Sequence, residues 1–294
     1  MDVLKGRSFQ DVMSLYEGRT LPQEQQVDIE RLPIKDKEAL KARICESTKR
    51  ASEVYKSIKS SGDPEMTEIE PNSIIRSEAV LISSELVDED VPLTLVCMKF
   101  FKYEVNSREE PDDSFQVVLA RGDYRNYTLK EMRANSISSK GADLVAEMII
   151  KNVGKNFRIP HRFVSPEFRR QKFGDMILGG MEEFVKQEST ENQKSTALVL
   201  DAGQLDLIFW LLNNGFVPDG KEEEEKLNRI LDGDPSLCIG KKYNIFPNTV
   251  PEESRVHSNS EDKFYVRFIK KIEPDESKEV AGVVEKTQKA VNEL

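Results

Sequence analysis

One stretch of the chain combines residue types that suit the binding of a phosphorylated ligand. Residues 157–164 are mostly apolar and predict a strand, a basic turn follows, and Gly174 stands near the start of a predicted helix. The first N–H groups of a helix have no helical carbonyl to accept them, and they lie at the positive end of the helix dipole. Together with Arg169, Arg170 and Lys172, these groups predict a phosphate-binding site.

The composition limits the class of protein. A chain of 294 residues is long enough for one or two domains, and its net charge of −10 argues against a broad nucleic-acid-binding surface. No apolar run approaches the length of a membrane span, and no apolar signal segment follows the first residues. Cys45, Cys97 and Cys238 are far apart and have no metal-ligand spacing, so we expect reduced core thiols, no metal site and a cytoplasmic protein.

Helical spacing near the N-terminus predicts an amphipathic layer packed on the main domain. One short helix is expected over residues 8–16 and a longer one over 37–60, with Asp36 as its N-cap. This layer could also present a face to another protein, although no specific residue supports that alternative. β-Branched and aromatic residues then predict strands over 79–83, 93–103 and 115–120. The charged segment 106–114 predicts a hairpin loop.

The second half of the chain alternates between strand and helix patterns. Residues 124–140 are polar with weak helical features and are not placed. Two strands are expected over 146–151 and 157–164, joined by a turn at 152–156. A helix over 170–187, a buried strand over 197–201 and a second helix over 205–213 follow. Asn214-Gly215 is typical of a left-handed helix end. This order predicts a mixed or parallel α/β sheet with right-handed crossovers.

The C-terminal part is less regular. The charge run 222–225 indicates a solvated helix start, and the final strand is expected over either 236–243 or 263–272, of which the second alternates better. After Pro274, apolar residues recur at helical spacing to the C-terminus. This amphipathic helix would pack on its own domain or on a second copy of the chain, so a homodimer is one expected arrangement.

The segment 146–218 resembles the GNAT family, the GCN5-related N-acetyltransferases. In that family a strand ends in V-x-P-x-[YF]-R and continues into [RQ]-x-x-G-x-[GA], which opens a long helix. Residues 164–169, Val-Ser-Pro-Glu-Phe-Arg, match the first pattern. Residues 169–174 match the second at its first and last positions, with Lys172 in place of the middle glycine. The later Asn-Gly-Phe-Val-Pro at 214–218 is similar to the family's G-F-x-P strand and the helix end before it.

The resemblance implies an α/β (α+β) fold with a mixed, mostly antiparallel sheet that splays into a V shape and is flanked by helices. An added helical region precedes it. We therefore divide the chain into a helical N-terminal extension (1–70), a GNAT-like acyltransferase domain (71–272) and a C-terminal amphipathic helix (273–294).

The resemblance also implies acetyl-CoA as the acyl donor. The amides of 170–175 would hold its pyrophosphate, and the strand backbone would pair with its pantetheine arm. The thioester would lie between this strand and the strand that ends at Asp201. The implied cofactor-binding residues are Phe163, Val164, Arg169, Arg170, Gln171, Lys172, Phe173, Gly174 and Asp175. Because lysine does not adopt a positive φ cheaply, Lys172 predicts weakened rather than lost binding.

The same resemblance leaves the catalytic residues unassigned. The tyrosine that protonates the thiolate in many members corresponds to Leu211, which has no proton to donate, and a frequent asparagine corresponds to Gln204. His161 is the histidine nearest the predicted site, but strict alternation places it on the same strand face as Phe157, which favours a structural role. A bulge at Pro160 would reverse that side, so no base is assigned.

Two functions remain open. The first is an enzyme that moves an acetyl group from acetyl-CoA to an amine of a small molecule or a protein. The second is a catalytically silent member that binds CoA or a protein partner. The motif at 164–169 and the basic turn favour the first function, whereas Lys172 and Leu211 favour the second. The acidic balance mildly favours a cationic amine or a basic peptide as acceptor, although nothing in the sequence identifies it.

Overall fold

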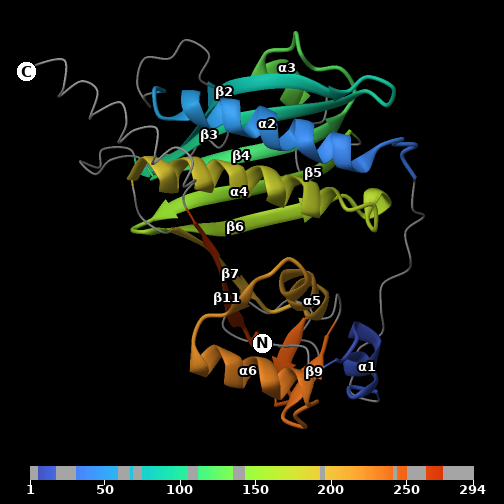
Figure 1. The fold of residues 1–294 in the computed structure, drawn as a ribbon. Coiled ribbons are helices and arrows are strands. Elements are labelled where there is room, and N and C mark those ends of the chain that lie inside the picture. Colours follow the sequence, from blue (N-terminus) through green and yellow to red (C-terminus); the bar gives the residue numbers. More distant parts are fainter. Residues whose placement is uncertain are drawn as a thin grey trace, which may run out of the picture. The chain divides into compact units, whose positions relative to one another are not determined.

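The protein has a mixed α/β structure in which mostly antiparallel sheet is flanked by helices (Figure 1). The computed structural model describes residues 6–17, 31–58, 67–68, 75–104, 112–134, 143–192, 196–240, 244–249 and 263–273. The chain divides into two compact units. Unit 1 comprises Met1–Val27 and Val199–Lys270, and unit 2 comprises Asp28–Leu198 and Lys271–Leu294.

Unit 2 is built on a sheet in which every neighbouring pair of strands is antiparallel. In sheet order its strands are β1 (Thr67–Glu68), β2 (Ile75–Asp88), β3 (Leu93–Glu104), β4 (Asp112–Arg121), β5 (Leu144–Val153) and β6 (Asn156–Val164). The predicted turn between the last two strands is confirmed, with Gly154 at φ 67°. The predicted loop over 106–114 is wrong at its end, because pairing with β3 extends β4 back to Asp112. Residues 105–111 lie outside the described residues.

Two long helices cover one face of this sheet, α2 (Lys37–Tyr55) and α4 (Phe173–Asn192), and they lie side by side (Figure 1). Asp36 caps α2 as predicted, accepting hydrogen bonds from two backbone N–H groups. The helices approach closely at Gly180, where an added Cβ would lie 2.7 Å from the hydroxyl oxygen of Thr48. A glycine at that point therefore permits the close helix contact.

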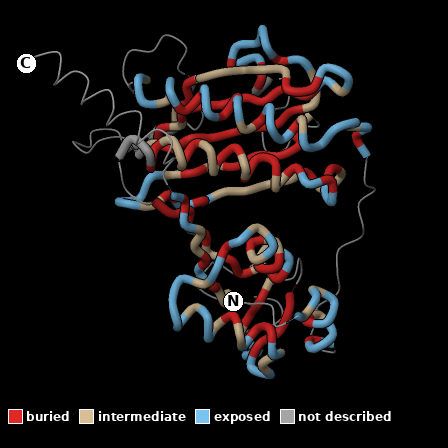
Figure 2. Tube along the Cα trace, in the orientation of Figure 1, coloured by how far each residue is buried: buried red, intermediate tan, exposed pale blue. Residues whose placement is uncertain are grey.

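The opposite face of the sheet is covered by the short helix α3 (Leu129–Ala134), within the segment that the sequence pattern leaves unplaced. Leu129 and Met132 pack against an apolar cluster that includes Val96 and Val118. The central strands are therefore buried on both sides, as Figure 2 shows. With six residues, α3 is too short to cover the whole face.

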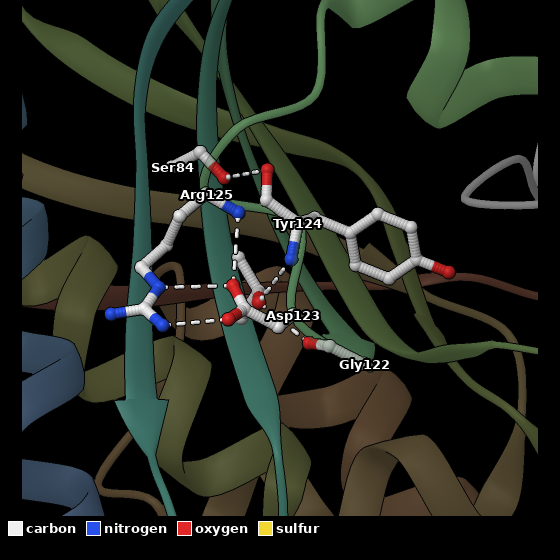
Figure 3. Close-up of polar contacts among 6 residues, drawn as sticks. Ser84, Gly122, Asp123, Tyr124 and Arg125 are labelled. Carbon is white, nitrogen blue, oxygen red and sulfur yellow. Dashed lines mark hydrogen bonds and ion pairs between the residues drawn. The ribbon is translucent and has the colours of Figure 1, made fainter.

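The turn that follows β4 is closed by its own hydrogen bonds (Figure 3). The Thr94 hydroxyl donates to the Gly122 carbonyl at 2.6 Å and accepts from the Tyr124 N–H at 3.0 Å. The Ser84 hydroxyl donates to the Tyr124 carbonyl, and the Arg125 guanidinium pairs with Asp123. The Gly122 carbonyl and both backbone groups of Tyr124 are thus satisfied within the protein.

Unit 1 contains the remaining elements. They are α1 (Phe9–Ser14), β7 (Thr196–Ala202), α5 (Leu205–Asn213), β8 (Val217–Pro218), α6 (Lys221–Leu231), β9 (Leu237–Ile239), β10 (Ile245–Pro247) and β11 (Val266–Ile272), with β7 and β11 running past the unit's sequence limits. The predicted helix 205–213 and its end are confirmed, with Gly215 at φ 78°. Strand β11 pairs with β8, which decides for 263–272 as the final strand, whereas 236–243 supplies β9 of a separate hairpin. The expected C-terminal helix lies outside the described residues.

Within the described ranges, no helix is both long and apolar enough to span a membrane, and no group of three or more histidine, cysteine or acidic side chains is arranged to hold a metal ion. Cys97 and Cys238 are buried and Cys45 is partly buried, all as free thiols. Burial raises the pKa of the Cys97 thiol to about 12, which keeps it in the neutral form that suits a core position.

Candidate functional site

The basic turn joins β6 to α4 through a left-handed backbone. After Val164, a short 3-10 turn covers Pro166–Phe168, and α4 begins at Phe173. Between them, Arg170 has φ 62° and Lys172 has φ 69°, the two non-glycine residues with positive φ among the described residues. Such a conformation costs a residue with a Cβ about 1–2 kcal/mol. The lysine therefore adopts the conformation that the glycine of the resembled motif would adopt without this cost.

Several backbone donors of this turn remain open. The first hydrogen bond of α4 runs from the Met176 N–H to the Lys172 carbonyl at 3.0 Å. In the described part of the chain, the N–H groups of Arg170, Lys172, Phe173 and Gly174 have no acceptor. Open amides of this kind at the start of a 20-residue helix form a donor set that suits an anion.

The three cations of the turn are also open. The side chains of Arg169, Arg170 and Lys172 are exposed, and no carboxylate of the described residues pairs with them. Arg169 makes one long contact, from Nε to the Val164 carbonyl at 3.4 Å. The cations are therefore available to an anionic ligand in a chain whose net charge is −10.

Buried side chains hold the turn in place between these exposed positions. Gln171 is 6% exposed, and its Oε1 accepts the Leu32 N–H at 2.9 Å. Phe168 and Phe173 are each 1% exposed, and the Arg121 guanidinium lies 5.5 Å from the Phe168 ring centre. The turn therefore has a buried inner side that fixes its shape and an outer side that presents donors and charge.

The two strand residues predicted to contact the cofactor, Phe163 and Val164, direct their backbone groups to opposite sides of β6. Phe163 pairs with Glu147 and Val164 pairs with Ala146, and the Ser165 N–H donates to β5 at 3.0 Å. Because successive residues of a strand direct their backbone groups to opposite edges, Phe163 points its groups toward β5 and Val164 points its groups away. Among the other predicted contacts, Asp175 is partly exposed in the first turn of α4.

Strand β6 contains a bulge before His161. Ile149 pairs with His161 and Lys151 pairs with Arg158, so β6 has one more residue than β5 over this interval. The extra residue falls at the Ile159-Pro160 step, where proline removes a backbone donor. The bulge that Pro160 suggests in the sequence is therefore present.

The bulge moves His161 to the opposite face of the sheet. Phe157 packs edge-on against Phe184 of α4, with ring centres 5.8 Å apart, whereas Phe163 packs on the apolar cluster of the other face. His161 lies two residues from Phe163, and its Nε2 is 2.7 Å from Oε1 of Glu147. The expectation from strict alternation that His161 shares a face with Phe157 is wrong, because the extra residue reverses the alternation.

Glu147 is a candidate site residue that the sequence pattern did not single out. Its side chain is 5% exposed, and its second oxygen accepts a hydrogen bond from Nε2 of Gln116 at 3.2 Å. A signal was present, because Glu147 is the single charged residue in the apolar run 144–150. A carboxylate in such a run is expensive to bury without partners, which here come from two neighbouring strands.

The positions expected for other catalytic side chains are occupied differently. Leu211 is fully buried in α5, so no acid is available there. Gln204 is the N-cap residue of α5, without a side-chain capping bond, and forms a bridge with Asn244. The Asp201 carboxylate accepts a hydrogen bond from Arg267 Nε at 2.8 Å, and this bond raises the pKa of Arg267.

The chain is similar to solved acetyltransferase structures. A nourseothricin acetyltransferase is 14% identical, with 59% of this chain and 78% of that chain covered and a TM-score of 0.31. The ribosomal-protein-S18-alanine N-acetyltransferase from Escherichia coli is 12% identical, with coverage of 55% and 70% and a TM-score of 0.29. A Bacillus anthracis str. Ames protein named as a streptothricin acetyltransferase, in complex with acetyl coenzyme A, is 11% identical, with coverage of 70% and 95% and a TM-score of 0.30.

No family model and no curated protein matches the sequence. The three solved structures carry the kind of activity that the sequence resemblance implies. Their TM-scores are too low to establish a common fold, however. The proposals below rest on the residues of this chain.

Proposed function

We propose that the protein is an acetyl-CoA-dependent N-acetyltransferase. The observation that carries this proposal is the open turn between β6 and α4, in which four backbone N–H groups have no acceptor in the described residues. A pyrophosphate offers several oxygens that suit consecutive amides at the positive end of a helix. The V-x-P-x-F-R sequence at 164–169 places this turn directly after a strand, as the resembled family does.

The donor set fits a CoA thioester in charge and in arrangement. Arg169, Arg170 and Lys172 supply positive charge on the outer side of the turn, and Val164 directs backbone groups away from β5, where an amide-bearing pantetheine arm can pair with them. When bound, acetyl-CoA supplies an activated acetyl group. The residues of the turn bind and orient this donor, and the acceptor is an amine whose identity stays open.

Titration with acetyl-CoA tests the binding half of this proposal. We expect saturable binding by calorimetry and a rise in thermal stability, because a ligand that binds only the folded state stabilises it. Arg170→Glu should weaken binding by about 100-fold, since a repulsive charge replaces an attractive one beside the phosphates. Lys155→Glu is the matched control, because Lys155 lies in the turn that opens β6, at the other end of the strand. Unchanged affinity in Arg170→Glu would remove the pyrophosphate assignment.

One observation favours the alternative, a catalytically silent protein that binds CoA or a protein partner. Leu211 is fully buried at the position where the resembled family often has its proton donor. Thiol release from acetyl-CoA in the presence of an amine panel separates the two functions. Binding without thiol release would identify a binding protein, and absence of binding at millimolar acetyl-CoA would exclude the enzyme and the CoA-binding protein alike.

A further inference from the structure

We infer that His161 is the base that receives the proton of the acceptor amine and that Glu147 positions it. This inference rests on the proposed function. Its basis is a chain of three side chains from adjacent strands: Gln116 of β4, Glu147 of β5 and His161 of β6. They end in an imidazole on the sheet face opposite α2 and α4.

The geometry fixes which nitrogen of the imidazole can act. An ionised carboxylate only accepts hydrogen bonds, so the 2.7 Å contact between Nε2 and Glu147 Oε1 places the hydrogen on Nε2. The lone pair is then on Nδ1, for which the described residues provide no partner. A buried carboxylate that orients an imidazole and leaves its other nitrogen basic is the arrangement that activates histidine as a general base.

Burial separates the two roles. The Glu147 side chain is 5% exposed and both its oxygens are engaged, so it is shielded from substrate and holds the ring. The His161 side chain is 42% exposed, so it can meet an amine and later release a proton to water.

The position of His161 relates it to the proposed donor site. It lies three residues before the end of β6, or roughly 10 Å along the strand from Val164. An acetyl-CoA held at the turn and extended along β6 would run toward His161. The Pro160 bulge supplies the change of face, because without the extra residue the imidazole would point toward α4 instead.

The proposed step balances as follows. The ammonium form of the acceptor gives one proton to Nδ1 of His161, which becomes an imidazolium. The freed nitrogen lone pair forms the C–N bond at the thioester carbonyl carbon, and the C–S bond breaks with its electron pair on sulfur. The second proton that the nitrogen loses passes to this sulfur, giving the amide and the CoA thiol. The imidazolium then releases its proton to solvent.

The step predicts a pH dependence set by the groups around the imidazole. Glu147 is the charged group in contact with it, and Gln116 is neutral. Beyond the bulge, the next charged residues on the same face are two cations that pair across the strands, Lys151 of β5 and Arg158 of β6. Only the neutral imidazole has a lone pair on Nδ1 to receive the proton, so thiol release should depend on pH, and this dependence should be lost when His161 is replaced.

The test compares His161→Gln, His161→Ala and Glu147→Gln with Lys155→Gln, a control in the same hairpin. Acetyl-CoA affinity is measured by calorimetry, and thiol release is followed from pH 5 to 9 with water, spermidine and a lysine peptide as acceptors. Affinity should stay within about twofold in all variants, whereas both His161 changes should lower thiol release by about 10²–10⁴-fold and abolish the inflection. In Glu147→Gln the pH profile should differ from that of the wild type, because an uncharged amide replaces the carboxylate in contact with the imidazole. The control should match the wild type.

Each other outcome overturns the proposal. A wild-type pH profile in His161→Gln would refute His161 as the base. ¹⁵N spectra that place the hydrogen on Nδ1 would refute the assigned tautomer. If both His161 variants unfold, an unmoved inflection in Glu147→Gln decides against it. Binding of acetyl-CoA without any thiol release would overturn both the role of His161 and the catalytic half of the proposed function. If only the role of His161 is refuted, the acetyl-CoA site and the transferase activity still stand.

Discussion

Two turns follow strands that finish at the same end of the unit 2 sheet, and their polar groups are arranged differently. The turn after β4 binds the Gly122 carbonyl and both backbone groups of Tyr124 through Thr94 and Ser84, and it pairs its arginine with Asp123 (Figure 3). The turn after β6 leaves four N–H groups and three cations open, while its inner side chains are buried. Both turns are held firmly, but only the second of the two combines open N–H groups with cations that no carboxylate of the described residues pairs.

The difference shows how a protein can keep a donor set in place without a ligand. In the β6 turn the shape comes from Gln171 and from two buried phenylalanines rather than from bonds among the donors themselves. A site whose geometry is fixed in advance loses little conformational entropy on binding. In the turn after β4, the hydrogen bonds of Thr94 and Ser84 hold the turn itself in place. Four substitutions test this difference between the two turns.

The largest effect is expected in the closed turn. Thr94→Val keeps the shape of the side chain but removes the partner of both the Gly122 carbonyl and the Tyr124 N–H. Two unpaired polar groups should lower the free energy of unfolding by about 3 kcal/mol, with no change in acetyl-CoA affinity per folded molecule. Urea unfolding and calorimetry measure the two quantities. A loss of affinity without a loss of stability would contradict the division of roles.

The inner tether of the open turn should affect both quantities. Gln171→Leu removes the acceptor of the Leu32 N–H, so the free energy of unfolding should fall by about 1–2 kcal/mol. Acetyl-CoA affinity should fall by about tenfold as the turn loosens. Gln171→Asn, which keeps an amide oxygen and adds no charge, is the control and should retain more of both. Equal affinity in wild type and Gln171→Leu would show that the tether does not hold the donors.

The left-handed lysine offers a change of opposite sign. Lys172→Gly relieves the positive φ of 69° and should raise the free energy of unfolding by about 1 kcal/mol. Affinity for acetyl-CoA should fall only a few-fold, because one cation is lost while the amides stay. Lys172→Ala separates the terms, since it loses the charge but keeps the Cβ. A less stable Lys172→Gly would mean that the lysine side chain supports the turn.

The effect that is smallest near neutral pH appears only at alkaline pH. Burial, with a hydrogen bond from the phenol to Asp143 at 2.8 Å, raises the pKa of Tyr124 to about 12. Because the unfolded chain loses this proton near pH 10 and the folded protein retains it, the contribution of Tyr124 is present below pH 10 and declines from pH 10 to 12. Tyr124→Phe should flatten this part of the stability curve relative to wild type, as measured by urea unfolding from pH 8 to 12. Parallel curves would rule out this contribution.

The sequence by itself determined the local features. Asp36 as a cap, Gly154 in a hairpin turn and Gly215 at a helix end each act through the backbone of a few neighbouring residues, so their patterns sufficed. The spacing 164–174 likewise predicted a basic turn between a strand and a helix, because strand end, charge and glycine are all read within one short segment.

The tertiary structure alone decided which side chains meet. One extra residue at Pro160 reversed the face of His161, and the pairing of three strands brought Gln116 and Glu147 beside it. Gln171 became a tether only because Leu32, far away in the chain, lies against it. Contacts of this kind depend on register and packing between distant segments, and a pattern that repeats every two or four residues carries no information about them.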